Sequence, residues 1–372
     1  MPFLTDMLQE AEMDRRNVIA GEINQQSQHG LDDGQAPFDP VRVMRYVRAN
    51  IFGQEHVLQS IEDILYVAAS PIGDKSRPLF VALLLGPTGV GKTELVRVLS
   101  RAIYADAERF CRIDMNTLSQ AHYSAAITGA PPGYAGSKEG HSLLSHDLIE
   151  GEDDRPGLVL FDEIEKASEP VTLSLMNIFD NGRLVLTSGE RSYDFRNSLI
   201  FMTSNLGARE LETWLSKYRP WAVLRRQVTS RASIEKKIIG RVLNKQFLPE
   251  FLNRVDDILT FRALDQDAFA QVIEKRIEEI KVQLLSQRIR LEAGEEITEL
   301  FLSFGFDRRY GARAINRTIR KYLEIPLAKF IVNGKNLIAE KGMTQIACMR
   351  ESDQGDPHVR FKAVPAEDES SC

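Results

Sequence analysis

The run Gly86-Pro-Thr-Gly-Val-Gly-Lys92-Thr93 constrains this chain more than any other feature, because it matches the phosphate-binding pattern G-x-x-x-x-G-K-[ST] at every fixed position. A short apolar run, Leu79 to Leu85, precedes it, and Glu94 to Ile103 has the spacing of an amphipathic helix. The sequence therefore predicts a strand, a glycine loop and a helix. A chance glycine-rich turn is the alternative, and the flanking strand and helix argue against it.

The chemistry of phosphate binding explains the residue types in this loop. Glycines let backbone N–H groups close around phosphate oxygens, and the start of the following helix adds a favourable dipole. Lys92 supplies a positive point charge, and the hydroxyl of Thr93 would hold Mg²⁺. The residues that we expect to bind ATP here are Gly86, Pro87, Thr88, Gly89, Val90, Gly91, Lys92 and Thr93.

Composition sets limits on location and partners. With 372 residues, 43% hydrophobic and 27% charged, the chain can form two folded units. The net charge of −6 argues against nucleic acid as the main partner, because binding a phosphate backbone requires a basic surface. Cys111, Cys348 and Cys372 are scattered and indicate neither a disulfide framework nor a zinc site. We find no apolar stretch of membrane-spanning length and no signal-peptide core at the start, so we expect a cytoplasmic protein.

Five short apolar segments are separated by sequence of helical periodicity, which is typical of a parallel sheet covered by helices on both faces. They are Leu79–Leu85, Phe110–Ile113, Gly157–Phe161, Ser198–Thr203 and Ile258–Phe261. After Phe261 the pattern predicts helices at Ala268–Gln287, Glu296–Ser303 and Ala312–Phe330, and short strands at Ile289–Leu291, Thr344–Met349 and His358–Ala363.

These patterns predict an α/β protein with four parts. We expect a flexible polar arm over residues 1–37 and a large ATP-binding domain over residues 38–262, built on the central parallel sheet. A smaller, mainly helical domain follows over residues 263–348, and a polar C-terminal extension over residues 349–372.

Two acids at the end of an apolar strand form the second part of the expected site. Asp162 and Glu163 follow Gly157-Leu-Val-Leu-Phe161, which is the form expected of the partner of a phosphate loop in an ATPase. Asp162 would hold the magnesium ion, and Glu163 would orient and deprotonate the water that attacks the γ-phosphate. Alone, such a strand end is more often a solvated turn; together with the upstream loop it indicates ATP hydrolysis.

Further motifs follow in a fixed order. They are Gly129-Ala-Pro-Pro-Gly133-Tyr-Ala-Gly136, Leu160 to Ala167, Asp194-Phe-Arg-Asn197, Met202 to Gly207, Phe247 to Arg254 and Gly305 to Arg313. Through them, residues Ile51 to Leu337 resemble the second ATPase module of Clp-type AAA+ unfoldases and disaggregases. The resemblance implies an AAA+ P-loop domain with a helical lid. It also implies a ring of identical chains, usually a hexamer, with ATP at the subunit boundaries.

The resemblance implies a role for four groups around the nucleotide. Ile51 and Phe52 would line the adenine pocket, where the alternative is an ordinary helix-start turn. Asn205 would be the polar sensor that helps to hold the attacking water, and otherwise a common turn residue. Arg254 resembles an arginine finger offered to a neighbour's ATP, and its alternative is a surface salt bridge with Asp256 or Asp257. Arg313 resembles the second sensor, which couples the lid angle to hydrolysis, and is otherwise a solvated helix arginine.

The resemblance also implies a polypeptide substrate. Tyr134, with Gly133, Ala135 and Gly136, would project into the central channel and grip an extended chain through apolar contact. By composition alone Pro-Pro-Gly-Tyr is simply a turn. Arg183 to Phe195 resembles the hairpin region that lines the same channel lower down.

Several departures from the family pattern narrow this expectation. We recognise one ATPase module and no adaptor domain, so substrate choice would depend on the arm, the pore or an adaptor protein. Ala125-Ala-Ile127 stands where the family commonly carries an arginine, and Ala135 replaces the usual valine. Ile239-Gly240-Arg241 replaces the apolar tripeptide of protease-partnered members with a charged one in a predicted helix, so we expect no docking to a barrel protease.

Residues 212–237 leave two interpretations open. They carry Trp214, Tyr218 and Trp221 among basic residues, a pattern that can bind nucleic acid or an acidic partner. Such a segment more often packs its aromatic side chains on the domain and leaves its charges in solvent.

The sequence therefore predicts an ATP-driven ring that unfolds, threads or remodels proteins through a central pore. An ATP-controlled assembly scaffold or switch is the alternative from another class, because accessory domains are not recognised. A nucleic-acid motor is the third possibility, supported only by the basic aromatic segment.

Overall fold

The computed structural model describes residues 38–117, 144–152, 154–185, 192–208, 210, 213, 231–304, 311–334, 344–353 and 356–364. The expected arm (1–37), most of the segment 212–237 and the expected pore residues Gly133, Tyr134, Ala135 and Gly136 lie outside these residues.

The first part of the chain forms a five-stranded sheet with strand order β2-β3-β6-β1-β7, in which all neighbouring pairs are parallel. Its strands are β1 (Phe80–Leu85), β2 (Cys111–Asp114), β3 (Gly157–Asp162), β6 (Ser198–Ser204) and β7 (Asp257–Thr260). They match the five predicted segments to within a residue or two, and the predicted parallel sheet is confirmed. Because the strands run in one direction, the carboxyl ends of β1, β3 and β6 lie at the same edge.

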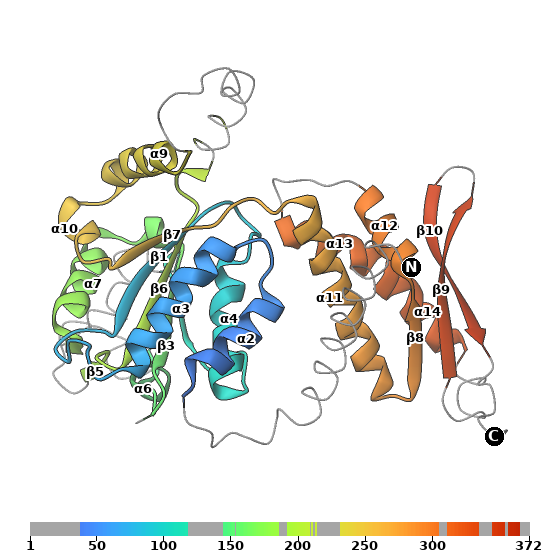
Figure 1. The fold of residues 1–372 in the computed structure, drawn as a ribbon, viewed down its shortest axis with the longest axis horizontal. Coiled ribbons are helices and arrows are strands. Elements are labelled where there is room, and N and C mark those ends of the chain that lie inside the picture. The colour runs from blue at the N-terminus through green and yellow to red at the C-terminus, as the bar shows by residue number, and fades with distance from the viewer. Residues whose placement is uncertain are drawn as a thin grey trace, which may run out of the picture.

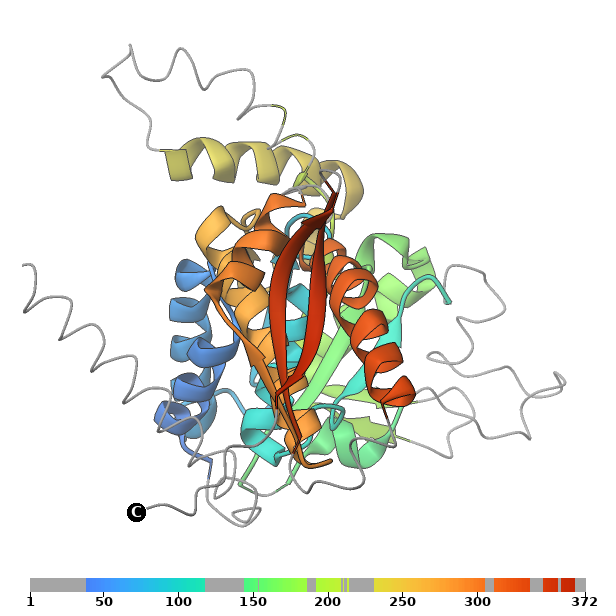
Figure 2. The same ribbon diagram turned by 90° about the vertical axis from the view of Figure 1, so that its right-hand side faces the viewer.

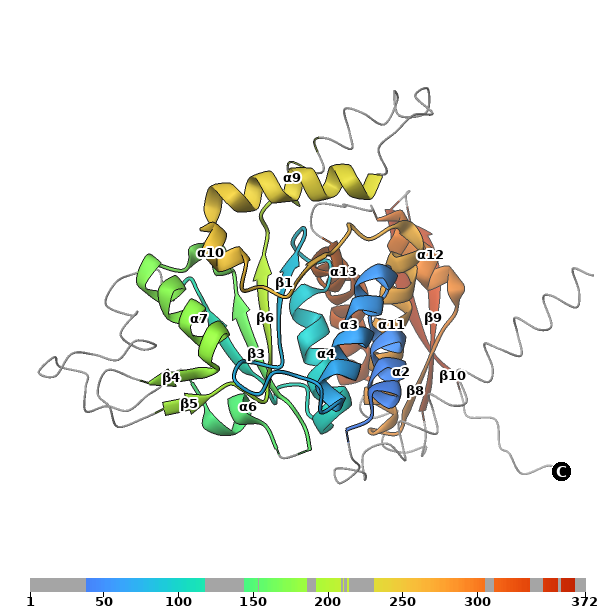
Figure 3. The same ribbon diagram turned by 60° about the vertical axis from the view of Figure 1, so that its left-hand side comes forward.

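Helices cover both faces of this sheet (Figure 3). One face carries α2 (Pro40–Asn50), α3 (Glu55–Ala69) and α4 (Lys92–Tyr104). The other carries α6 (His146–Glu150), α7 (Glu169–Asn181), α9 (Arg231–Gln246) and α10 (Pro249–Leu252). Side chains of β1 alternate between the two cores, since Val81 and Leu83 belong to one apolar cluster and Ala82 and Leu84 to the other.

A short antiparallel hairpin extends from the end of α7. It consists of β4 (Arg183–Val185) and β5 (Ser192–Asp194), with Leu184 paired to Tyr193. This hairpin falls within the segment Arg183–Phe195, for which the sequence predicts a hairpin. Its tip, residues 186–191, lies outside the described residues.

The second part of the chain combines helices with a small sheet. The helices are α11 (Gln266–Leu285), α12 (Glu295–Ser303), α13 (Gly311–Ile319) and α14 (Ile325–Asn333). The strands are β8 (Ile289–Ala293), β9 (Thr344–Asp353) and β10 (Asp356–Val364), in the order β10-β9-β8. Figure 2 shows the β9-β10 hairpin, in red, across the outer side of this domain.

The hairpin bears on where the small domain ends. The expected boundary between residues 348 and 349 falls inside β9, which pairs with β8 on one side and β10 on the other. Cys348 and Val359, from β9 and β10, are buried in the apolar core of the small domain. Residues 349–353 and 356–364 therefore continue the sheet of this domain rather than follow it as a separate extension.

The predicted single helix Ala312–Phe330 is interrupted. A π-helical turn, η2 (Arg320–Glu324), separates α13 from α14. The physical reason is Pro326, which has no N–H group to donate to the helix and sits in the first turn of α14. Leu323 and Leu327, on either side of this junction, both belong to the small-domain core.

Candidate active site

The predicted phosphate loop has the backbone that its glycines require. It connects β1 to α4, and Gly86, Gly89 and Gly91 all have positive φ angles, of 147°, 79° and 105°. A Cβ atom on Gly86 would lie 2.6 Å from the carbonyl oxygen of Phe261, so this glycine also permits close packing against the end of β7. The loop opens onto the amino end of α4, where backbone N–H groups can bind phosphate.

Lys92 is held at the centre of the site. Its side chain is 8% exposed, and its ammonium group donates to the carbonyl oxygens of Gly86 at 2.5 Å and Pro87 at 2.8 Å, and to Oδ1 of Asn205 at 2.9 Å. Burial lowers the pKa of Lys92 from 10.5 to about 8, although Glu165 and Asp162 partly oppose this shift. This contact joins two predicted site residues: Lys92, at the start of α4, and Asn205, directly after β6.

Asp162 is fixed by two residues that sequence reasoning missed. One carboxylate oxygen, Oδ1, accepts a hydrogen bond from the hydroxyl of Thr203 on β6. The other, Oδ2, forms an ion pair with Arg112 of β2 at 2.5 Å. Thr203 lies within the motif Met202 to Gly207 but was not singled out, and Arg112 belongs to no motif that we recognised. Both become neighbours of Asp162 because β2 and β6 flank β3 in the sheet.

Glu163 has an unusual backbone and a defined hydrogen bond. Its φ angle is 56°, a left-handed conformation that is uncommon outside glycine and often found at functional sites. Its N–H donates to Oγ1 of Thr203 at 3.0 Å, and its Oε2 accepts from Nδ2 of Asn116 at 2.6 Å. Thr203 thus bridges both acids, and Asn116, missed from the sequence, orients the carboxylate of the expected base.

Glu165 is a further acid beside the loop that sequence reasoning did not single out. Its Oε1 accepts a hydrogen bond from the backbone N–H of Asn205 at 3.2 Å. Its Oε2 is buried and has no hydrogen-bond partner among the described residues. The negative charge of Glu165 lies close enough to Lys92 to favour the protonated ammonium group.

The small domain completes the site from the opposite side. The N–H of Ala312, in the first turn of α13, donates to the carbonyl oxygen of Gly89 in the phosphate loop at 2.8 Å. Gly311 has a φ of 51°, and a Cβ atom there would lie 2.4 Å from Gly89 O. The expected lid therefore contacts the phosphate loop directly, and only glycine permits that approach.

The resulting cleft is lined by residues of both domains and encloses about 2430 Å³, including solvent at its mouth. It brings together predicted residues from separate elements. Its lining also includes residues that the sequence did not single out, among them Tyr46, Asn50 and Lys275. The predicted residues on its lining are Ile51, Phe52, Thr88, Gly89, Val90, Gly91, Lys92, Thr93, Asp162, Glu163, Asn205 and Arg313.

The residues present fit a magnesium nucleotide. Among the residues that the structure describes, no group of three or more His, Cys, Asp or Glu side chains could hold a metal ion alone. Mg²⁺ at nucleotide sites needs only one or two protein oxygen ligands, with phosphates and water supplying the rest. The hydroxyl of Thr93 and the carboxylate of Asp162 are the two oxygen donors that would serve.

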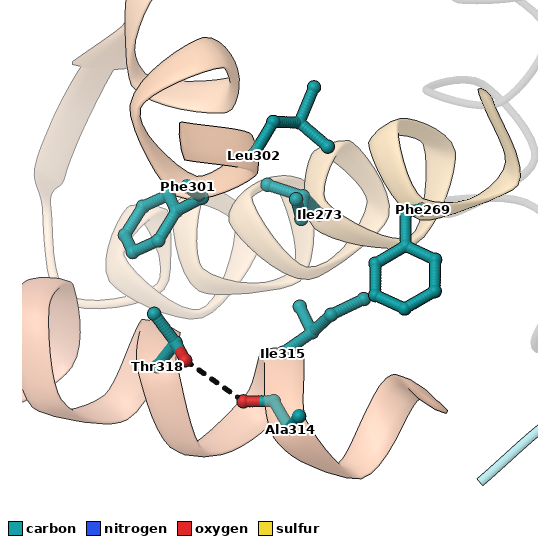
Figure 4. Close-up of a pocket in the computed structure, with 7 residues that line it drawn as sticks. All are labelled: Phe269, Ile273, Phe301, Leu302, Ala314, Ile315 and Thr318. Atoms are coloured by element: carbon teal, nitrogen blue, oxygen red, sulfur yellow. Dashed lines mark hydrogen bonds between the residues drawn. The ribbon is translucent and has the colours of Figure 1, made fainter. Parts of the chain in front are cut away.

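A second, smaller hollow has different chemistry (Figure 4). It encloses about 360 Å³ among α11, α12 and α13 and is lined by Phe269, Ile273, Phe301, Leu302, Ala314, Ile315 and Thr318. Its one hydroxyl, that of Thr318, donates to the carbonyl of Ala314 at 3.0 Å. The lining has no charged group to bind a phosphate, so of the two the larger cleft is the one suited to a nucleotide.

Arg254 lies away from this cleft. It is not among the described residues that line the cleft, and its Nε forms an ion pair with Oδ2 of Asp180 on α7 at 2.7 Å. The alternative that we set beside the arginine finger, a surface salt bridge, is present, but with a different acid. Asp256 instead pairs with Arg77 at 2.9 Å and accepts from the N–H of Val81 at 2.8 Å.

No helix within the described residues is both long and apolar enough to cross a membrane.

Comparisons with known proteins agree with this arrangement. The family described as AAA domain (Cdc48 subfamily) matches residues 77–258, and the C-terminal, D2-small domain of ClpB protein matches residues 264–345. A Pseudomonas aeruginosa protein named ATP-dependent protease ATP-binding subunit-like protein AmiB is 46% identical over 350 residues, covering 90% of this chain and 93% of that protein. A Rhodococcus erythropolis protein of similar name is 37% identical, with coverage of 90% and 93%.

Longer chaperones match the same region. The Chaperone protein ClpB of Meiothermus ruber is 35% identical over 296 residues, which are 79% of this chain but only 33% of the chaperone. The chain thus corresponds to about a third of that relative. With the family matches to both domains and the site geometry in agreement, the chain belongs to the Clp-type AAA+ family and is an ATPase.

Proposed function

We propose that this ATPase is a ring-forming motor, a hexamer of identical chains in the cytosol, that unfolds or remodels polypeptides by threading them through a central pore. The observation that carries the proposal is the direct contact between the lid and the phosphate loop, from the N–H of Ala312 to the carbonyl of Gly89. Because the nucleotide lies where the two domains meet, each change of nucleotide state acts on the angle between them. In a ring, that change of angle would move one subunit against the next.

The chain's own residues divide the work of hydrolysis. Lys92 and the backbone of the loop bind the phosphates, while Asn205 and Glu163 hold the attacking water at the carboxyl edge of the sheet. Glu163 takes the proton from that water. Bound Mg²⁺, held by Thr93 and Asp162, would neutralise charge that develops on the phosphates.

Two arginines would complete the transition-state environment. Arg313 lines the same subunit's cleft and lies one residue from the lid contact with the loop. We propose that Arg254, which is remote from its own cleft, acts on the ATP of a neighbouring subunit. A guanidinium group in that role contributes on the order of 10³ to 10⁵ in turnover in other nucleotide hydrolases.

Threading is tested by Tyr134→Ala, with Tyr66→Ala as the matched control because Tyr66 is an exposed tyrosine on α3. We expect the Tyr134 variant to keep most ATP hydrolysis and to lose unfolding of a fluorescent client protein, while the control keeps both. If the Tyr134 variant still unfolds every client tested, the threading proposal is wrong.

The variant Glu163→Gln distinguishes the scaffold or switch hypothesis from the motor hypothesis. This variant should bind ATP and not hydrolyse it. A motor would lose its cellular function with this change, whereas a switch locked in its ATP state would keep it. The same variant can trap client or adaptor proteins from the cell for identification.

We further propose that the chain works without a barrel protease, although the printed names of two relatives refer to a protease subunit. Ile239 is buried and lies, with Gly240, within α9, so this tripeptide is not presented as an exposed loop. Degradation of an unfolded client on adding a barrel protease, with ATP, would contradict this. A nucleic-acid motor is the less favoured function, and ATPase stimulation by DNA or RNA at low salt would support it.

A further inference from the structure

Asp180 holds Arg254 through one specific nitrogen of its guanidinium group. Arg254 Nε donates to Asp180 Oδ2 at 2.7 Å, and Nη1 donates to the carbonyl oxygen of Glu250 and approaches Sδ of Met176 at 3.9 Å. These contacts use Nε and Nη1, and Nη2 has no hydrogen-bond partner among the described residues. The guanidinium group is thus held at two of its three nitrogens and presents the third, Nη2.

The backbones that carry the two side chains are anchored by the same aromatic cluster. Phe179, which precedes Asp180, packs against Phe251 with ring centroids 5.8 Å apart, and Phe251 stacks on Phe247 at 5.2 Å. Phe179 and Phe251 are both almost fully buried. Arg254 N donates to the carbonyl of Phe251 at 3.1 Å, which links the arginine to this cluster.

The chain after Arg254 is fixed as well. Asp256, two residues on, accepts hydrogen bonds from Arg77 and from the N–H of Val81 on β1. The arginine therefore projects from a short segment held at both ends. Its partner Asp180 lies at the end of α7, one residue before the helix terminates.

The pair lies on the side of the large domain away from its own lid. Figure 1 shows α7 and α10 at the far left, whereas α11 and α13, which form the lid side of the cleft, are on the right. Half of each side chain or less is exposed, 31% for Arg254 and 46% for Asp180. This is an ion pair at the surface, where pairing alone contributes little to stability.

We propose that Asp180 is a positioning residue for Arg254: it fixes the guanidinium group so that Nη2 faces the nucleotide of the adjacent subunit. The inference rests on the proposed role of Arg254 in a neighbour's active site. A guanidinium group that is already held in place loses less conformational freedom on contacting the γ-phosphate than the side chain of an unrestrained arginine does. The contribution is therefore to turnover and not to nucleotide affinity in the same subunit.

The first test compares Asp180→Ala and Asp180→Asn in steady-state ATPase assays, without any polypeptide substrate, after native mass spectrometry has verified ring formation. We expect kcat to fall about tenfold for Asp180→Ala, equivalent to losing one charged hydrogen bond in the transition state, with KM within about twofold. Asp180→Asn keeps an acceptor for Nε and should retain more activity. Unchanged kcat in Asp180→Ala would overturn the inference.

The second test asks in which subunit the defect acts. Asp180→Ala subunits keep an intact nucleotide cleft, and Glu163→Gln subunits keep an intact Arg254. In mixed rings, a Glu163→Gln neighbour can supply its arginine to an Asp180→Ala site, so activity should exceed the average of the two separate rings. If Asp180 acts only on the active site of its own subunit, the ATPase activity of the mixed rings will not exceed that average, and the inference is wrong.

Two further mixtures calibrate the result. Arg254→Ala with Glu163→Gln should gain activity in the same way, and if it does not, the premise that Arg254 acts between subunits fails and the inference with it. Asn205→Ala with Glu163→Gln has both defects inside the cleft and should show no gain. Because the readout is ATP hydrolysis alone, the result is separate from whether the ring threads polypeptides.

Discussion

The lowered pKa of Lys92 predicts that nucleotide binding takes up a proton near neutral pH. In the protein without nucleotide this pKa is about 8, because burial away from water disfavours the charged ammonium group. Bound phosphate favours the charged form, so the pKa of Lys92 in the complex is higher than in the free protein. Affinity is therefore constant well below pH 8 and falls as pH rises through that value.

The size of the effect follows from the pKa. For one group that titrates near 8 in the free protein and stays protonated in the complex, the dissociation constant rises about tenfold from pH 7 to pH 9. This corresponds to about 1.4 kcal/mol. At pH 8 roughly half a proton is taken up for each nucleotide bound.

Two assays measure this. Titration of a fluorescent ADP analogue at pH 7, 8 and 9 gives the dissociation constants, and calorimetry at pH 8 in two buffers of different ionisation enthalpy gives proton uptake. Lys275→Met is the matched control, because Lys275 also lines the cleft and its pKa is also lowered by burial. The control should keep the pH dependence. A pH-independent dissociation constant with no proton uptake would refute the assignment to Lys92.

Three substitutions test other parts of the site. Gly311→Ala places a Cβ atom 2.4 Å from Gly89 O at a positive φ, so we expect weaker nucleotide binding and a changed lid angle, measured by fluorescence energy transfer between labels on the two domains. Thr203→Val keeps the shape of the side chain but removes the hydroxyl that bridges Asp162 and the N–H of Glu163. We expect the ATPase kcat to fall about tenfold or more, and the free energy of unfolding to fall by about 1–3 kcal/mol. Phe251→Ala removes a fully buried ring from the aromatic cluster. Denaturant titrations should show the free energy of unfolding lowered by about 3–5 kcal/mol, and a decrease of less than about 1 kcal/mol would contradict the observed packing.

Local sequence patterns were sufficient for the sheet and for half of the active site. The phosphate loop and the acids Asp162 and Glu163 follow directly from the ends of apolar strands. Strand periodicity and loop glycines are short-range signals, because each depends on the conformation of a few consecutive residues. Parallel strands then bring their carboxyl ends to one edge, which is why these residues meet in the structure.

The partners of those residues depended on the tertiary structure. Arg112, Asn116 and Thr203 contact the two acids from other strands or loops, and no local pattern indicates that they do so. The extent of the small domain was equally undetermined, because pairing of β9 with β8 joins segments more than fifty residues apart.

The charged residues show the same division between what the sequence predicts and what the tertiary structure decides. The sequence identified Arg254 and the acids near it, yet the folded chain pairs it with Asp180, 74 residues earlier. The sequence predicted Lys92 as a phosphate ligand, but the lowered pKa of its ammonium group comes from its burial in the folded chain. Residue type and spacing thus determined which chemical groups are present, whereas the tertiary structure decided their neighbours and their solvation, because both are set by contacts between distant parts of the chain.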